Sequence, residues 1–233
     1  MERELSNEFQ EIIKTIVAPN LKAVGFKKNK LNFNRTFDRL VQSINVQRSQ
    51  YNHADRFIFT INLGFYNGQI FKISRNRTDE PKFVTTDNCF VWGRSGHLIY
   101  NKDYWYELTL DVDFKNVSLQ VENDLKIHII PLYDQLQTLN SILELLRTDF
   151  KNRPYHLIAS IDDVSVLELE FGDFQRGKEI LVNIYKQAII PKSAKHTTVY
   201  PDGREEVSWS EPGVNQFHIE KLLRIAQKYK IEL

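Results

Sequence analysis

The stretch Phe57-Ile-Phe-Thr-Ile-Asn-Leu-Gly-Phe65 decides the fold, because every second residue in it is large and apolar. Polar Thr60 and Asn62 stand between these apolar residues. Successive side chains of a β-strand point to opposite faces, so this pattern predicts a strand with one apolar face and one polar face. The apolar face requires a cover from other segments of the chain.

Two segments before this stretch alternate in the same way. In residues 31–37, Leu, Phe, Arg and Phe alternate with Asn, Asn and Thr, and in residues 40–49 apolar positions alternate with Ser, Asn and Gln. The connections between these segments are short, which favours antiparallel pairing. We expect further strands at 104–112 and 117–121, and mostly loop over 67–103, where Gly and Pro recur.

Helical periodicity flanks the predicted sheet. Apolar residues recur at every third or fourth position over residues 5–24, which predicts an amphipathic helix with a kink or break just before Pro19 and an end at Gly25. The clearest helical stripe covers residues 131–150 and begins at a proline. Three further helices are predicted at 161–171, 174–189 and 214–230.

We therefore predict an α+β protein with an N-terminal helix, a mainly antiparallel sheet of about five strands, a long helix and a C-terminal helical segment. Residues 1–150 would form an α+β domain, and residues 151–233 a mostly helical extension packed on it, with a boundary near Asn152–Tyr155. Turn residues at 200–204 predict either a small hairpin or a loop, so the order of residues 192–213 stays open.

Composition excludes several classes of protein. The 233 residues carry 31 Lys and Arg against 30 Asp and Glu, a net charge of +1, and 12% are aromatic. Disordered chains have fewer aromatic residues and a larger net charge, and no stretch has the roughly 18 apolar residues that a membrane span needs. A single Cys and a charged N-terminus lead us to expect a cytoplasmic protein without membrane contact or internal disulfide.

The polar face of the predicted sheet is the leading candidate site, because amides and short hydroxyls gather there. Uncharged donors and acceptors form directional hydrogen bonds that suit a peptide backbone, a sugar or a base edge. The same amides would be structural if they bonded to loop backbone covering the sheet. We expect a non-enzymatic binding module for a protein partner or a small polar ligand, without a cofactor. The candidate binding residues are Asn45, Gln47, Asn62, Trp92, Arg94, His97 and Trp105.

A basic segment gives a second hypothesis. Between residues 22 and 56, eight Lys and Arg stand against two Asp, with aromatic residues interleaved. Such a patch can contact phosphates, as in proteins that bind single-stranded nucleic acid. Charge blocks of this size are more often solvated surfaces, which makes nucleic-acid binding the weaker interpretation. The eight cations are Lys22, Lys27, Lys28, Lys30, Arg35, Arg39, Arg48 and Arg56.

Carboxylates give a third hypothesis, from a different functional class. Asp111 and Asp113 end one predicted strand, and Asp124 and Lys126 follow the next. Many magnesium-dependent nucleases hold a metal ion with acids on neighbouring strands and orient the attacking water with a Lys. The alternative to a binding module is therefore a metal-dependent nuclease or phosphodiesterase, although such short patterns often arise by chance.

Several motifs follow one another along the chain: Gly25-Phe-Lys-Lys28, Val41-Gln-Ser-Ile-Asn-Val-Gln-Arg-Ser49, Phe59-Thr-Ile-Asn-Leu-Gly64, Trp92-Gly-Arg94 and Trp105-Tyr-Glu-Leu108. This succession resembles a bacterial family of domains of unknown function, over roughly residues 5–150. The sequence departs from the family pattern after Arg94, where a second Arg is expected near Ser95 or Gly96. The resemblance implies no activity, cofactor or partner.

Overall fold

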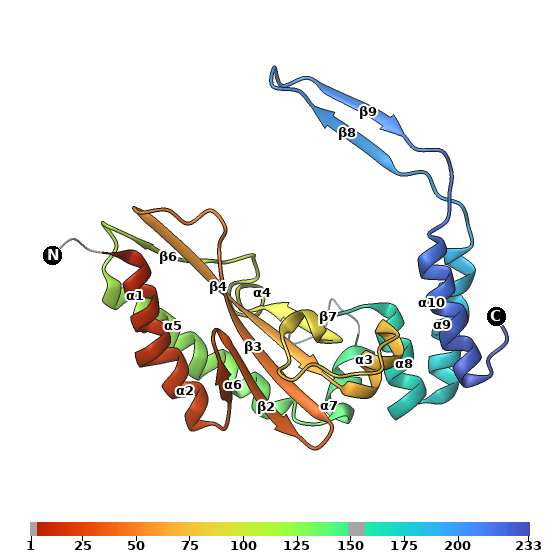
Figure 1. Ribbon diagram of the computed structural model, residues 1–233, viewed down its shortest axis with the longest axis horizontal. Coiled ribbons are helices and arrows are strands. Elements are labelled where there is room, and N and C mark those ends of the chain that lie inside the picture. Colours follow the sequence, from red (N-terminus) through yellow and green to blue (C-terminus); the bar gives the residue numbers. More distant parts are fainter. Residues whose placement is uncertain (1–3, 149–156) are drawn as a thin grey trace. The chain divides into compact units, whose positions relative to one another are not determined.

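The computed structural model describes residues 4–148 and 157–233, and contacts within the chain divide it into two compact units. The first unit is Met1–Ser160 and the second is Ile161–Leu233. The segment Asn152–Tyr155, at which a boundary is predicted, lies outside the described residues. The predicted α+β class is confirmed, and Figure 1 shows the helices and the central sheet.

Among the described residues, the first unit has a seven-stranded sheet in which all paired strands are antiparallel. The strand order is β1-β2-β3-β4-β5-β7, and β6 pairs with the other end of β4. The strands predicted at 31–37, 40–49 and 57–65 are confirmed. The strands are β1 (Lys27–Asn29), β2 (Asn32–Phe37), β3 (Leu40–Arg48), β4 (Arg56–Tyr66), β5 (Val91–Arg94), β6 (Tyr106–Thr109) and β7 (Ile158–Ala159).

The register between β3 and β4 sets the positions of both faces of the sheet. It pairs Ser43 with Gly64 and Asn45 with Asn62. The Tyr133 hydroxyl lies across this pairing, because it donates to the Ser43 carbonyl at 2.6 Å and accepts from the Gly64 amide at 3.0 Å. A one-residue slip would move every side chain of one strand to the opposite face.

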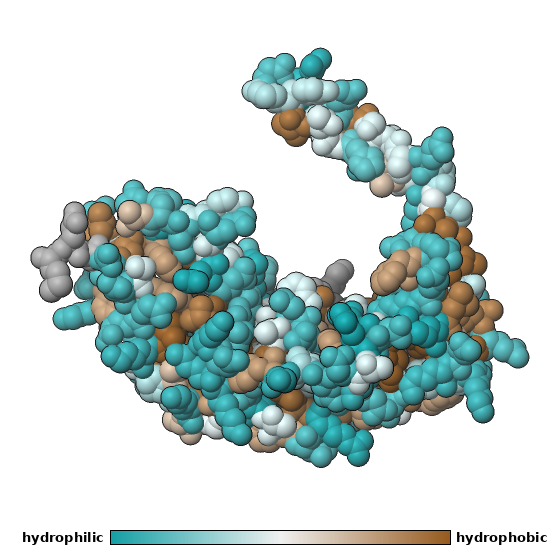
Figure 2. Space-filling model, viewed as in Figure 1, coloured by the Kyte–Doolittle hydropathy of each residue, from teal (hydrophilic) through white to brown (hydrophobic). Residues whose placement is uncertain are grey.

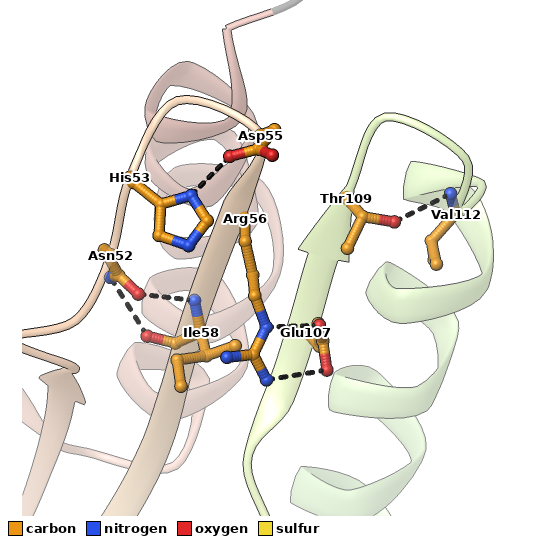
Figure 3. A network of polar contacts seen from close by, with 8 residues as sticks. All are labelled: Asn52, His53, Asp55, Arg56, Ile58, Glu107, Thr109 and Val112. Carbon is orange, nitrogen blue, oxygen red and sulfur yellow. Dashed lines mark hydrogen bonds and ion pairs between the residues drawn. The ribbon is translucent and has the colours of Figure 1, made fainter.

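The hairpin end of β3 and β4 is closed by side chains that act as backbone partners (Figure 3). The Asn52 amide group accepts from the Ile58 N–H at 2.7 Å and donates to the Ile58 carbonyl at 3.1 Å. Beside it, Arg56 on β4 donates to Glu107 on β6 at 2.6 Å. The ion pair between Arg56 and Glu107 joins β4 to β6, and it occupies this end of the sheet's polar face.

Helices cover the apolar face of the sheet. The N-terminal helix consists of α1 (Leu5–Ile12), a π-helical segment (Ile13–Val17) and α2 (Ala18–Ala23). Its Phe9 ring lies 4.9 Å from the Phe57 ring and 5.1 Å from the Phe59 ring, between centroids. Aromatic pairs at such distances add to the free energy gained by burying their apolar area.

Of the predicted kink or break just before Pro19, the break does not occur, because the helix continues through the proline. The turn ahead of the proline widens into the π-helical segment, so the backbone leaves α-helical hydrogen bonding just before the residue that has no N–H to donate. Gly25 ends the helix as predicted, with a φ of 92° that favours glycine. The Phe26 amide then donates back to the Leu21 carbonyl at 3.0 Å, as in a Schellman cap.

Three further predictions of secondary structure are corrected. Residues 67–103 are not mostly loop, and the strand at 117–121 is part of a helix. Val117 and Val121 are four residues apart, a spacing that fits both a strand and a helix face. The long helix at 131–150 is divided at Leu136–Thr138, and Phe150 lies outside the described residues. The helices are α3 (Gly68–Arg75), α4 (Ser95–Tyr100), α5 (Phe114–Asp124), a π-helical segment (Leu125–Ile129), α6 (Ile130–Gln135) and α7 (Leu139–Arg147).

A polar cluster lies within the apolar layer. Arg35 on β2 is 7% exposed and donates from Nε to Gln42 Oε1 at 2.8 Å and from Nη2 to Asp134 Oδ1 at 2.8 Å. Gln42 on β3 is fully buried and donates to the carbonyls of Tyr133 and Leu136 at 2.6 and 2.9 Å. The cluster links β2 and β3 to the end of α6. Loss of one member would leave polar groups of the others buried without hydrogen-bond partners, which costs free energy of folding.

We predict that Gln42→Leu destabilises the first unit by about 3 kcal/mol, because it leaves Arg35 Nε and two buried carbonyls without partners. Urea unfolding followed by circular dichroism measures this loss. The matched control is Gln47→Leu on the half-buried face of the same strand, which should cost less than about 1 kcal/mol. Equal losses for the two variants would contradict the role given to the cluster.

The second unit contains α8 (Ile161–Phe171), α9 (Phe174–Ala188), α10 (Gln216–Tyr229) and a separate hairpin of β8 (Lys195–Val199) and β9 (Glu205–Trp209). The helices predicted at 161–171, 174–189 and 214–230 are confirmed. The backbones of α8 and α9 approach closely at Gly177, whose carbonyl accepts from the Ser165 hydroxyl at 3.1 Å. No helix in the described part of the chain is long and apolar enough to cross a membrane.

We predict that Gly177→Ala destabilises the second unit by about 1–3 kcal/mol, despite the better helix propensity of Ala. A Cβ at Gly177 would lie 2.8 Å from the Leu169 backbone nitrogen, too close for any real contact. The comparison is Gly213→Ala, where a Cβ meets nothing within 4 Å. Thermal unfolding of both variants decides the matter, and an unchanged melting temperature for Gly177→Ala would refute the close approach.

Candidate functional site

The polar face of the sheet divides into a covered part and an open part. Ser43 and Thr60 are fully buried and donate to loop carbonyls, those of Val84 at 3.3 Å and Tyr104 at 3.1 Å. The amides of Asn45, Gln47 and Asn62 are only partly buried, and their hydrogen bonds run to other side chains of the same face. The two hydroxyls therefore have a structural role as partners of loop backbone, whereas the amides do not bond to loop backbone within the described part of the chain.

The amides form a hydrogen-bonded row across three strands, which we call the amide ladder: Asn32 on β2, Asn45 and Gln47 on β3, and Asn62 on β4. Asn45 Nδ2 donates to Asn32 Oδ1 at 2.9 Å. Asn62 Nδ2 donates to Asn45 Oδ1 at 3.2 Å and to Gln47 Oε1 at 2.8 Å. Among the described residues, nothing is hydrogen-bonded to Asn62 Oδ1 or to Gln47 Nε2.

Arg94 continues the row on β5, where its Cα is paired with that of Asn62. Its Nη1 donates to both carboxylate oxygens of Asp103, at 2.8 and 2.7 Å, and its guanidinium lies 5.0 Å from the Trp105 ring centroid. Partial burial opposes ionisation of Asp103, but the hydrogen bonds from Arg94 hold the pKa of that carboxyl below its ordinary value. Arg94 is thus fixed by one nitrogen, and its Nη2 has no partner in the described part of the chain.

A pocket of about 330 Å³ opens at the end of the amide ladder. The Trp92 ring stands at this pocket and is 47% exposed. Cys89 is buried there against Gly64, and burial raises the pKa of its thiol far above the ordinary value. The lining residues are Gln47, Asn62, Arg75, Thr86, Asp87, Cys89, Trp92 and Arg94.

The structure brings together four of the seven predicted binding residues. Gln47, Asn62, Trp92 and Arg94 line this pocket, and Asn45 is the next member of the amide ladder. Trp105 does not line the pocket: its ring lies under Arg94 and its Nε1 is 3.4 Å from Asp103 Oδ2. His97 is exposed on α4 and is outside the lining.

Sequence reasoning missed Arg75, Thr86 and Asp87, because they lie in the segment taken for loop. Local signals for α3 were nevertheless present. Asn67 caps the helix by accepting from the Ile70 amide at 3.0 Å, and Asn76 ends it in the left-handed conformation with a φ of 52°. Asparagine at both ends of an eight-residue segment is a recognisable helix signal.

The four residues of the nuclease hypothesis are not gathered at one site. Asp113 caps the start of α5 by accepting from the Lys115 amide at 2.9 Å, whereas Asp124 is buried at the end of the same helix. Asp124 accepts from the Tyr100 and Tyr106 hydroxyls at 2.7 Å each. Lys126 pairs with Glu122, and Asp111 is exposed in the turn before the helix. Within residues 4–148 and 157–233, no three His, Cys, Asp or Glu side chains are grouped as a metal site requires.

The eight cations of the basic segment are also divided. Arg35 is buried in the polar cluster, and Arg56 pairs with Glu107. The other six are exposed on α2 and on strands and turns of the first unit, where Lys28, Lys30 and Arg48 line one pocket. The segment therefore offers phosphate groups fewer cations than its charge count indicates.

We predict that Asp113→Ala lowers the free energy of unfolding by about 1 kcal/mol, through loss of the helix cap. Asp113→Asn should change it little, because Asn is an equally good cap. Chemical unfolding of both variants provides the measurement. A large loss in Asp113→Asn, which keeps the cap but removes the charge, would show that the carboxylate has another role.

The comparisons with known proteins agree with the resemblance seen in the motifs. No curated protein and no solved structure matches the chain. A family described as a domain of unknown function, DUF4304, matches residues 17–135, more than half of the chain. This match covers β1 to β6, α3 to α5 and the segments between them, and so includes the amide ladder and every residue that lines the pocket. The chain therefore belongs to this family of domains of unknown function.

Proposed function

We propose that this protein is a binding module that takes a small, planar, neutral ligand in the pocket at the end of the amide ladder. The volume of about 330 Å³ lies at the lower end of the range for small-molecule sites. The charged residues at the pocket balance each other, since Asp103 neutralises Arg94 and Asp87 offsets Arg75. An uncharged ligand suits this balance better than an anion.

One observation carries the proposal: three hydrogen-bonding groups with remaining capacity lie at the pocket on β3, β4 and β5, with Arg94 directly opposite Asn62 and Gln47 diagonal to it. They are the donor Gln47 Nε2, the acceptor Asn62 Oδ1 and the donor Arg94 Nη2. The amide ladder fixes this order, because both bonds of the Asn62 NH₂ group are made to its neighbours and its oxygen is left for the pocket.

The complement of a donor–acceptor–donor row is an acceptor–donor–acceptor edge. A carbonyl, an N–H and a second carbonyl in one plane form such an edge, which is the edge of a cyclic imide such as uracil. The Trp92 indole supplies a partly exposed aromatic surface on which a planar ring can stack. Because burial keeps Cys89 as a thiol, the lining supports recognition rather than attack on the ligand.

Uracil is the probe that tests this proposal, with 3-methyluracil as its matched control. The methyl group replaces the central N–H donor and leaves both carbonyls in place. We predict that uracil shifts the side-chain amide resonances of Gln47 and Asn62 in a saturable titration, and that 3-methyluracil binds at least tenfold more weakly, as expected when one buried hydrogen bond is lost.

The protein variants locate the site. Asn62→Ala/Arg94→Ala should abolish the titration, whereas Asn32→Ala, at the far end of the amide ladder, should retain it. Circular dichroism checks that both variants are folded. Absence of any uracil binding to the native protein would refute the imide ligand, and binding that survives the double substitution would refute this pocket.

A further inference from the structure

The hairpin of the second unit, residues 192–213, has an apolar face that nothing in the described chain covers; we call this hairpin the arm. Its strands β8 and β9 pair only with each other, and all ten of their residues are exposed. The bonds continue to the base of the arm, where Lys192 and Gly213 exchange backbone hydrogen bonds at 2.9 and 3.2 Å. An isolated two-stranded hairpin is marginally stable in water, so the arm gains from a further surface.

The register of the arm divides the side chains of β8 and β9 between two faces, and all of the apolar ones lie on one of them. Opposite residues of an antiparallel pair share a face, so His196, Thr198, Glu206 and Ser208 form one polar face. The other face carries Val199, Val207 and Trp209, which are 65%, 49% and 65% exposed. Lys195 and Thr197 also lie on this second face, and Glu205 completes it. This apolar face therefore has a cation near its base and an anion near its tip.

We propose that the apolar face of the arm binds the same face of a second copy of this chain. The charge pattern selects both the partner and the orientation. In this dimer a two-fold axis relates the two arms, which pack face to face and point in opposite directions. The Lys195–Trp209 end of each copy then lies over the Val199–Glu205 end of its partner. Lys195 of one copy then lies near Glu205 of the other at both ends of the interface. If the two arms pointed in the same direction, each end would bring two like charges together.

Two further observations support a second copy as the occupant. Neither Lys195 nor Glu205 has an ion-pair partner among the described residues, so both charges remain available. The face also carries exposed Trp and Val side chains along its length, with one charge at each end, and aromatic residues are enriched at the centres of protein interfaces. In Figure 2 the arm carries a few separate brown residues among teal and white ones, and brown residues gather at its base.

Charge exchange tests the proposal in the full chain by sedimentation equilibrium. The native protein should form a dimer, and Trp209→Thr should weaken the association by on the order of tenfold or more. Lys195→Glu and Glu205→Lys should each weaken it, because each places like charges together. An equimolar mixture of these two variants should dimerise, since every contact in the mixed dimer again joins a cation to an anion.

The control is His196→Glu, which adds an acid at the next position but on the polar face, and should leave the association unchanged. Circular dichroism confirms that the variants keep their helices. A native protein that stays monomeric at all concentrations would overturn the proposal. A mixture of the charge variants that associates no better than either alone would overturn the reversed face-to-face arrangement.

Discussion

The pairing of β3 with β4 is the constraint on which the rest of the first unit depends. It places the apolar side chains of both strands under α1 and α6, and it sets Asn45 opposite Asn62 on the other face. The Tyr133 hydroxyl links the helical layer to this pairing through the Ser43 carbonyl and the Gly64 amide. The same register thus determines the core and positions the amide ladder.

The polar face shows how packing and recognition share one sheet. Its hydroxyls are used by the loops that cover them, and its ion pair at the hairpin end joins β4 to β6. The amides bond to one another without a loop above them, and they leave one donor and one acceptor at the pocket. Hydrogen bonds in such a row orient and polarise each other, which prepares the remaining groups for a ligand.

The alternation of β2, β3 and β4 could be predicted from the sequence, because each strand has one covered and one partly open face. That Asn45, Gln47 and Asn62 share a face follows from the same period of two. Their mutual bonds could not be predicted, since these depend on the register. Arg94 is predicted beside this face in a loop segment, whereas it lies on β5 with its Cα paired to that of Asn62. The helix at Val117 and Val121 was missed because a spacing of four fits both periods, and with it the separation of Asp113 from Asp124.

The central claim is that the Asn62 NH₂ group faces its neighbours in the amide ladder while its oxygen faces the pocket. The most direct measurement is the set of nuclear Overhauser contacts of the Asn62 side-chain NH₂ protons. We expect contacts to the side chains of Asn45 and Gln47, together with slow exchange with water. Contacts to the Trp92 ring or to the Arg94 side chain instead would contradict the account, because the acceptor between the two donors would then be absent.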